Sequence, residues 1–371
     1  MTVATTPQIP LVDLRAQYET IRDEVASAWD EILGSMHLFL GPNCEAFDKE
    51  FAALCGTRHA IGVGNGTDAL ILALRALHIG QGDEVVTVSF TFFATVEAIR
   101  AVGATPVFVD VDESTALIDV DQALARIGPR TKAILPVHLF GRTVPLARLR
   151  ASGVPIVEDA CQAHGATLDV GARAGSGGTL GAFSFYFSKN LGAYGEGGSL
   201  TTNDDAIAEE LRLLRNHGQR TRYESVLMGY NSRLDELQAA VLRIKLRRLM
   251  VWNARRREIA RRYDELLADL PVKRPPLPRG EEHVFHLYVI CAPHRDALRD
   301  HLTARGIGTG VHYPIPCHQQ RAAAGLPIPR GGLPITERLS HEVLSLPMYP
   351  ELTDAQLETV ADGIRSFFAS R

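Results

Sequence analysis

The sequence contains few cysteines, and they form no recognisable pair. Its 371 residues include five cysteines and no Cys-x-x-Cys motif, which argues against a zinc site, a dithiol redox centre and a small disulfide-stapled module. We interpret the cysteines as reduced thiols of a cytosolic protein. The chain also lacks a signal-peptide pattern and any run near the roughly 18 apolar residues that a membrane helix needs. We therefore expect a cytoplasmic protein with no membrane partner.

Positive and negative charges nearly balance in this chain. Lys and Arg number 39 against 43 Asp and Glu, a formal net charge of −4, so no overall positive field would attract a nucleic acid. The stretch from Arg233 to Arg262 holds ten basic and three acidic residues. We interpret it as a solvated helix face or a local attraction for a diphosphate, and we expect no nucleic acid partner. The histidines show no His-x-x-x-His spacing, so we expect no metal site and interpret them as structural.

Seven short apolar or β-branched runs recur between residues 60 and 203, most of them followed by a helix-like stretch. This rhythm predicts an α/β fold, in which a mainly parallel seven-stranded sheet carries helices on both faces. The predicted strands are 60–64, 84–89, 105–111, 132–138, 155–158, 181–187 and 198–202. Ligands of such sheets bind beyond the carboxyl ends of the strands. The loops after these strands are therefore the expected place for chemistry.

Beyond the sheet the pattern becomes helical, and a proline-rich segment follows it. Apolar residues near a 3,4 spacing predict one or two long helices over 233–270. Residues 271–283 contain four prolines, which predicts a linker. We assign residues 1–250 to a large domain and 251–371 to a smaller α+β domain. The elements expected after the linker are a strand at 284–291 and helices at 294–305 and 353–369.

A glycine-rich turn, Gly62–Asp68, connects the first predicted strand to a helical run. Glycines let backbone amides approach an anion, and a helix N-terminus offers unpaired N–H groups with a favourable dipole. The turn therefore fits a phosphate cradle, and it equally fits a plain helix cap by Thr67 or Asp68. It is neither a dinucleotide fingerprint nor a Walker A loop, which disfavours a nicotinamide dehydrogenase.

Two further strand ends carry reactive side chains. Asp159 follows an apolar strand, where an acid is costly to bury without a cationic partner, although it also fits a helix cap. Lys189 follows the aromatic strand 183–187, whose alternation places Phe183, Phe185 and Phe187 on one face. Its position before a glycine-rich segment favours a partly buried, reactive amine over a solvated surface lysine.

A phosphate cradle, an acid and a lysine at neighbouring strand ends together match the needs of pyridoxal 5′-phosphate (PLP). The lysine forms a Schiff base with this cofactor, the acid pairs with its protonated ring nitrogen, and the cradle holds its phosphate. An aromatic ring to stack on the cofactor is available in the segment 89–95, at the end of another strand.

At this point the sequence resembles the DegT/StrS-type sugar aminotransferases, which are PLP enzymes with the aspartate aminotransferase fold (type I). The resemblance covers nearly the whole chain and rests on several long motifs in the right order. They are Ile9–Leu14, Gly64–Leu70, Glu158–Gly165, Ser188–Asn190, Arg215–Gly218, Gly229–Asp235 and His312–Pro316.

The resemblance implies a role for each residue of a cofactor site. It makes Lys189 the Schiff-base lysine, Asp159 the partner of the ring nitrogen, Phe92 the stacking residue and Gln162 the group beside the ring hydroxyl. The implied phosphate ligands are Thr67, the backbone of Asp68, and Ser184. Asn231 resembles an asparagine that reaches the phosphate from the other subunit, which implies a homodimer with a shared active site. In related enzymes, the positions that lie near the sugar nucleotide correspond to Tyr186, His312 and Tyr313 of this sequence.

Lys189 also bears on the reaction, since some relatives replace this lysine with histidine and dehydrate a sugar instead. Its presence favours transamination, with Lys189 as general base and acid. The resemblance implies L-glutamate as amino donor and a nucleotide-linked keto-deoxysugar, dTDP- or UDP-linked, as acceptor. The His312–Pro316 segment inclines us toward a 3-keto sugar. A keto-cyclitol acceptor and a non-catalytic binding or regulatory protein remain the alternatives.

Overall fold

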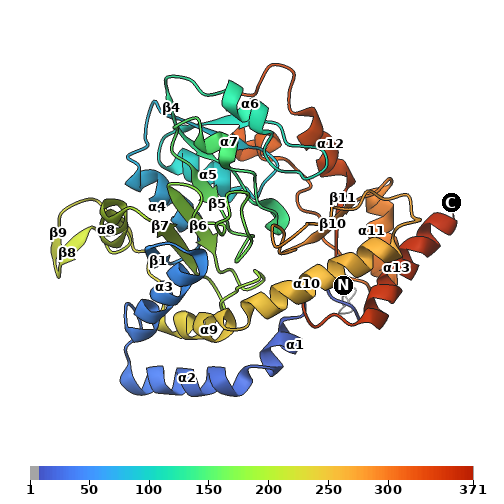
Figure 1. Ribbon diagram of the computed structural model, residues 1–371, viewed down its shortest axis with the longest axis horizontal. Coiled ribbons are helices and arrows are strands. Elements are labelled where there is room, and N and C mark those ends of the chain that lie inside the picture. The colour runs from blue at the N-terminus through green and yellow to red at the C-terminus, as the bar shows by residue number, and fades with distance from the viewer. Residues whose placement is uncertain (1–7, 371) are drawn as a thin grey trace.

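A computed structural model describes residues 8–370, and a layer of seven strands forms its centre (Figure 1). The strands of this layer are β1 His59–Val63, β2 Glu84–Val88, β3 Thr105–Val109, β4 Thr131–Leu135, β5 Val157–Asp159, β6 Leu180–Ser184 and β7 Gly198–Thr202. Four strands in the order β1-β7-β6-β5 lie beside three in the order β3-β2-β4. The two groups join where Ile134 bridges Ile156 and Val137 bridges Asp159, both in parallel register.

The layer confirms the predicted α/β class, and most of its strand pairs are parallel. Only β7 runs against its neighbours, since it pairs antiparallel with both β1 and β6. The remaining hydrogen-bonded pairs, β2 with β3 and β4, and β5 with β6, are parallel. The carboxyl ends of the parallel strands therefore meet at one edge, where the loops that follow them converge.

Residues 8–370 also contain thirteen α-helices. They are α1 Leu14–Glu19, α2 Arg22–Ser35, α3 Pro42–Cys55, α4 Gly66–Ala76, α5 Ala94–Ala101, α6 Val120–Ala125, α7 Ala147–Arg150, α8 Asp205–Leu214, α9 Glu236–Leu246, α10 Leu249–Leu266, α11 Arg295–Ala304, α12 Pro334–Glu342 and α13 Asp354–Ala369. The remaining strands are β8 Gln219–Thr221, β9 Glu224–Ser225, β10 Tyr288–Cys291 and β11 Val343–Leu346. None of the helices within residues 8–370 is long and apolar enough to cross a membrane.

Alternate side chains of the strands enter two different cores, which explains why the sheet is covered on both faces. Phe183 of β6 is buried in the cluster that contains side chains of α3 and α9. Its neighbour Ala182 is buried in the cluster that contains side chains of α4 and α8. This alternation is what an interior sheet between two helical layers requires.

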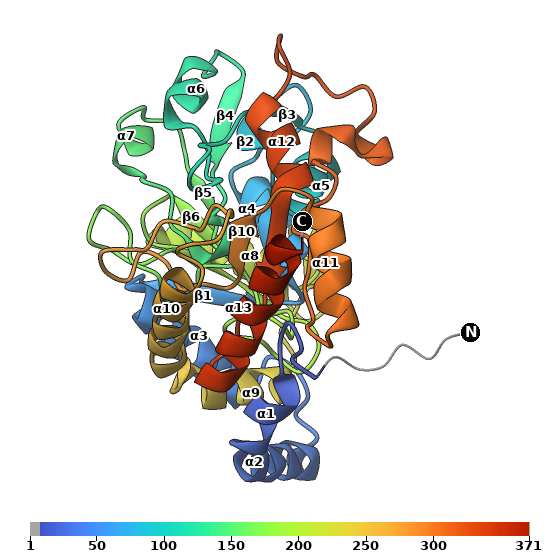
Figure 2. The ribbon, with the colours of Figure 1, turned by 90° about the vertical axis from the view of Figure 1, so that its right-hand side faces the viewer.

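Helices α11 and α13 of the C-terminal part lie side by side (Figure 2), and this part has a hydrophobic core that also includes Ile9. Ile259 and Tyr263 of α10 are buried in it together with Leu344 of β11 and Ile364 of α13. Leu339 of α12, in contrast, belongs to the core of the large sheet. The division into 1–250 and 251–371 remains a prediction, and its residues 1–7 and 371 lie outside the described part of the chain.

The strand predicted at 284–291 is shorter in the structure and begins at Tyr288. Its first half does not join the sheet, because the guanidinium of Arg256 donates to the carbonyl oxygens of Phe285 and His286, at 3.1 and 3.4 Å. A buried side chain thus satisfies backbone groups that a strand would otherwise pair. The predicted helices at 294–305 and 353–369 are confirmed as α11 and α13.

Candidate functional site: a cavity at the carboxyl ends of the strands

A cavity of about 760 Å³ lies where the loops after β1, β2, β5 and β6 converge. All but one of the site residues expected from the sequence line this cavity. They are Thr67, Asp68, Phe92, Asp159, Gln162, Ser184, Tyr186, Lys189, His312 and Tyr313. Asn231 is absent from the lining, is exposed, and pairs through its backbone with Asn216.

The N-terminus of α4 forms one end of the cavity. A methyl group added at Gly66 would lie 2.5 Å from Cβ of Ser184, so only glycine lets the helix end approach β6 this closely. Asn65 caps the helix by accepting from the N–H of Asp68 at 2.8 Å, so the alternative of a cap by Thr67 or Asp68 is wrong. The carboxylate of Asp68 accepts from the hydroxyl of Ser232 at 2.6 Å. A helix N-terminus beside a serine hydroxyl is a suitable phosphate site.

Asp159 ends β5 and is almost completely buried, with 5% of its surface exposed. Its Oδ2 accepts from the Thr95 hydroxyl at 2.9 Å, and Thr95 lies 2.9 Å from the hydroxyl of Thr91. No helix begins at Asp159, so the helix-cap alternative is wrong here as well. The carboxylate is instead held by the Thr95 hydroxyl and by the backbone N–H of Cys161, which donates to Oδ1 at 3.3 Å. It lines the cavity, where it can pair with a cation of a bound group.

Lys189 follows β6 in a turn that the sequence did not predict. The strand ends at Ser184, and the N–H of Lys189 donates to the carbonyl of Tyr186 at 2.8 Å. Phe183 and Phe185 are buried as expected, whereas Phe187 is 37% exposed, because the turn carries it off the packed face. Burial lowers the pKa of the Lys189 amine, and the nearby Cys161 and Asp159 partly oppose this. A lowered pKa favours the neutral, nucleophilic amine.

Aromatic and polar side chains from the C-terminal part close the cavity. The ring of Tyr313 lies 6.1 Å from that of Phe92, and its hydroxyl accepts from Nε2 of Gln162 at 3.1 Å. The Oε1 of Gln162 accepts from the N–H of Phe140 at 2.6 Å, which fixes the orientation of the amide. Burial lowers the pKa of His312 to about 4, with Lys189 adding to the effect, so this imidazole is neutral at pH 7.

Two residues of the cavity were missed or misjudged from the sequence. The role of the Thr95 hydroxyl was missed, because Thr91 lies in the loop before α5 and Thr95 in its first turn, and only the fold of this loop brings their hydroxyls within 2.9 Å. His286 was interpreted as structural, yet it lines the cavity, and its Nδ1 lies 3.3 Å from Oδ1 of Asn190. Burial lowers the pKa of His286 well below its usual value, so it too is neutral.

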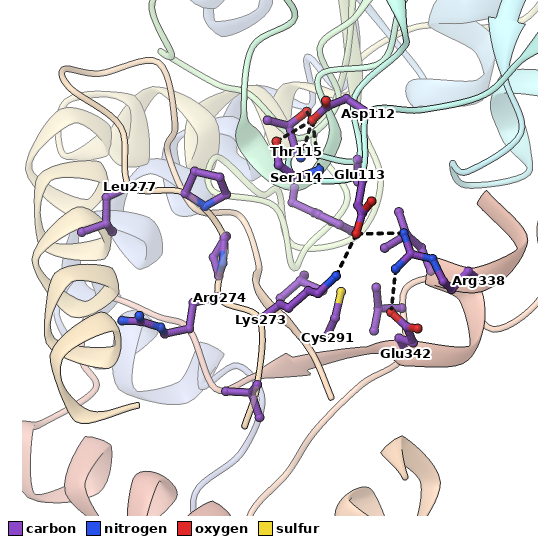
Figure 3. Close-up of a pocket in the computed structure, with 18 of the residues that line it drawn as sticks. Asp112, Glu113, Ser114, Thr115, Lys273, Arg274, Leu277, Cys291, Arg338 and Glu342 are labelled. Carbon is purple, nitrogen blue, oxygen red and sulfur yellow. Dashed lines mark hydrogen bonds and ion pairs between the residues drawn. The ribbon is translucent and has the colours of Figure 1, made fainter. Parts of the chain in front are cut away.

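A second hollow of about 800 Å³ lies between the loop 112–116, the linker and α12 (Figure 3). Its charged side chains are paired with one another. Glu113 interacts with Lys273 at 2.7 Å and with Arg338 at 3.1 Å, and Arg338 also lies 3.7 Å from Glu342. This hollow holds none of the expected site residues. The chemistry therefore belongs to the first cavity.

The match with known proteins agrees with the geometry of that cavity. The model of the DegT/DnrJ/EryC1/StrS aminotransferase family matches residues 19–365. The chain belongs to this family. It is an aminotransferase, and the predicted resemblance and fold type I are confirmed. The cofactor of the family is PLP, as expected.

Relatives with assigned activities are similar along almost their whole length. The chain is 47% identical over 369 residues to the dTDP-3-amino-3,4,6-trideoxy-alpha-D-glucose transaminase of Streptomyces venezuelae, covering 98% of this chain and 97% of the relative. It is 45% identical over 361 residues to the UDP-N-acetyl-3-dehydro-alpha-D-glucosamine 3-aminotransferase of Acidithiobacillus ferrooxidans, covering 96% and 97%. The crystal structure of S. venezuelae DesV in complex with a ketimine intermediate has a TM-score of 0.94 and 47% identity, covering 99% of this chain and 100% of that one.

The side chains present fit PLP at three separate points. Gly66 packs closely against Ser184, so the N–H groups at the start of α4 and the serine hydroxyl lie near one another. A phosphate could accept hydrogen bonds from both. Asp159 is a buried carboxylate without a cation of its own among the described salt bridges of residues 8–370, and a protonated ring nitrogen would supply one. Lys189 provides an amine of lowered pKa in the same cavity. When bound, the cofactor supplies an electron sink for charge that develops at the donor's α-carbon.

Proposed function

We propose that the chain transfers the amino group of L-glutamate to the 3-keto group of a nucleotide-linked deoxysugar, in a site shared by two copies of the chain. The observation that carries this proposal is that one cavity gathers Lys189, Asp159 and the helix end at Thr67. The names of the two relatives, both acting at carbon 3 of a nucleotide sugar, support the acceptor class. The nucleotide is dTDP or UDP in this proposal.

In the proposed reaction each side chain has one task. Lys189 attaches the cofactor and, once the amino donor has displaced it, holds and moves the proton at the donor's α-carbon. Asp159 would pair with the protonated ring nitrogen of the cofactor. Thr67, the backbone of Asp68 and Ser184 hold the phosphate, with the Asp68 N–H shared with Asn65. These tasks are compatible, because all of these groups line one cavity.

The remaining expected residues orient the cofactor ring and the acceptor. Phe92 lies on one wall and is proposed to stack on the ring, while Gln162 contacts the ring hydroxyl. Tyr186, His312 and Tyr313 line the part of the cavity that we assign to the sugar nucleotide. Because His312 is neutral, it can accept a hydrogen bond from a sugar hydroxyl without adding positive charge beside Lys189.

Asn231 is proposed to act on the partner's cofactor. It is exposed and outside its own cavity, which is expected of a residue that serves a second copy. The neighbouring hairpin β8–β9 and its flanks expose several large apolar side chains, which would be covered in a dimer. They are Tyr223, Val226, Met228 and Tyr230. A homodimer with shared sites accounts for both observations.

The function is tested by supplying L-glutamate with dTDP- and UDP-linked 3-keto sugars, their 4-keto isomers, and a keto-cyclitol. We expect amination at carbon 3 of a nucleotide sugar and one 2-oxoglutarate per amine formed. Turnover of the keto-cyclitol alone, or of 4-keto sugars alone, would contradict the proposed acceptor. The exposed Lys132 provides the matched control, since Lys132→Ala removes a lysine of the same sheet that lies outside the cavity.

A further inference from the structure

Two charged side chains without a place in the cavity are buried in α9 and α10. Lys245 of α9 and Arg256 of α10 are 1% and 4% exposed. Figure 1 shows the two helices following one another below the sheet. Charges buried this deeply are costly, so their positions call for a physical explanation.

Lys245 contacts the loop that carries Lys189. Its Nζ donates to the carbonyl of Gly192 at 2.7 Å and lies 4.2 Å from the centroid of the Tyr194 ring. This loop is folded tightly, since a methyl group added at Gly192 would lie 2.4 Å from the carbonyl oxygen of Phe187. The ammonium of Lys245 therefore holds the chain three residues beyond Lys189 by a charge-assisted hydrogen bond and a cation–π contact.

Arg256 contacts the segment that carries His286. Its Nη1 donates to the carbonyl oxygens of Phe285 at 3.1 Å, His286 at 3.4 Å and Met348 at 2.9 Å. His286 lines the active-site cavity. Arg256 thus fixes a second part of the cavity wall by hydrogen bonds to the backbone of that segment. Lys245 fixes the loop after Lys189 in the same way.

The partners of both cations are backbone carbonyl oxygens of the cavity wall and of Met348. Burial lowers the pKa of Lys245 to about 7 and that of Arg256 to about 10, and Glu351 opposes the shift in both cases. The hydrogen bonds to these carbonyl oxygens are therefore the contacts that account for the positions of the two side chains.

We propose that Lys245 and Arg256 are positioning residues for transamination. Lys245 fixes the loop of Lys189, and Arg256 fixes the segment of His286. The proposal rests on the proposed role of Lys189. It adds a link from α9 and α10 to the two backbone segments that carry Lys189 and His286.

Lys245→Met tests the anchor, because it keeps the length of the side chain and removes the charge. We expect kcat to fall about tenfold while KM for both substrates stays within about twofold, since a charge-assisted hydrogen bond is lost outside the substrate site. We also expect the pH at which the lysine-linked visible band titrates to shift, because Lys189 is less well held. Lys132→Met on the exposed β4 position is the control. An unchanged kcat and an unchanged titration would overturn the anchor.

Arg256→Met tests the second anchor, because it removes the donor to the carbonyl oxygens of Phe285 and His286. We expect kcat to fall while KM stays within about twofold, and an unchanged kcat would overturn the role of Arg256. Arg262→Met, at an arginine of the same helix that pairs with the exposed Glu358, is the matched control and should leave kcat unchanged.

Amide hydrogen exchange tests the Lys245 anchor without relying on the catalytic activity of the protein. In the cofactor-free chain, amides between Phe187 and Gly198 should exchange faster in Lys245→Met than in the parent, and those of the control Lys132→Met should not. Equal exchange in all three proteins would overturn the anchor even if the enzyme is active. Should the parent bind PLP but fail to transaminate, faster exchange would still support the anchor, and only the proposed function would fall. If Lys245→Met does not fold, Lys245→Gln is measured in its place, and unchanged exchange between Phe187 and Gly198 would then overturn the anchor.

Discussion

The hydroxyl of Thr95 donates to Oδ2 of Asp159 at 2.9 Å in the buried floor of the active-site cavity. Since Thr95 has one hydroxyl hydrogen and uses it here, the hydroxyl of Thr91, 2.9 Å away, must donate to Thr95. Two threonines thus form a chain that ends on the carboxylate proposed to face the cofactor's ring nitrogen. The chain fixes the orientation of this carboxylate.

Thr95→Val is expected to lower kcat about tenfold, because one hydrogen bond to a charged group is lost, worth about 1.5 kcal/mol. Asp159→Asn is expected to lower kcat by about 10² to 10³, since the charge itself is removed. Thr95→Ser keeps the hydroxyl and should restore most of the rate. Steady-state kinetics decide the matter, and equal rates for Thr95→Val and Thr95→Ser would show that the hydrogen bond plays no part.

Gly66→Ala is expected to weaken retention of PLP, because its methyl group would lie 2.5 Å from Cβ of Ser184 and push the helix end away from the phosphate. Gly34→Ala provides the control, since a methyl group there meets nothing within 4 Å in the exposed helix α2. The control should stabilise the protein by up to about 1 kcal/mol. The measurement is the dissociation constant of PLP. Equal constants in parent and Gly66→Ala would contradict the phosphate site.

Asn231→Ala is expected to weaken PLP binding about tenfold or more, because a hydrogen bond to a charged phosphate is lost. Mixed dimers of Asn231→Ala and Lys189→Ala should regain one complete site of two, since that site takes Lys189 from one chain and Asn231 from the other. Activity is measured after mixing and purification of the heterodimer. No recovery would place the complete site within a single chain.

His164 gives the protein a defined sensitivity to acid. Its Nε2 donates to the carbonyl of Ser184 at 2.9 Å, and burial lowers its pKa from 6.5 to about 3. Below pH 6.5 the unfolded chain binds a proton at this histidine and the folded chain does not, so stability falls as the pH decreases toward 3. The loss is at most about 1.4 kcal/mol for each pH unit.

His164→Gln keeps a donor for Ser184 and removes the titrating group. Denaturant unfolding at pH 7, 6 and 5 should therefore show a smaller loss of stability toward pH 5 in this variant than in the parent. His78→Gln, at an exposed histidine, serves as the control. Identical pH slopes for the parent and His164→Gln would contradict burial of a neutral imidazole.

Much of the fold was predictable because it depends on local patterns. Each of the seven strands was expected from a short apolar run, and the structure confirms all of them. The gathering of Lys189, Asp159 and Thr67 was expected too, since strand ends of a mainly parallel sheet converge. These features depend on periodicity and on the order of strands and helices, both of which can be inferred from the sequence.

What was missed depends on contacts between distant segments. The exposure of Phe187 follows from a turn stabilised after β6, which strand alternation alone does not reveal. His286 enters the cavity because Arg256 holds its backbone from another helix. The position of Asn231 outside its own cavity was expected only through the family resemblance, and its proposed role lies between chains. Tertiary contacts of single side chains leave little trace in local sequence.

The most direct test of the account is the absorbance spectrum of the protein with PLP, before and after addition of L-glutamate. The account predicts a lysine-linked visible band that converts to the pyridoxamine form, with one 2-oxoglutarate released per chain. Lys189→Ala should lack this band and Lys132→Ala should keep it. A band that L-glutamate leaves unchanged would contradict the proposed donor. The absence of any band in the parent protein would contradict the central role of Lys189.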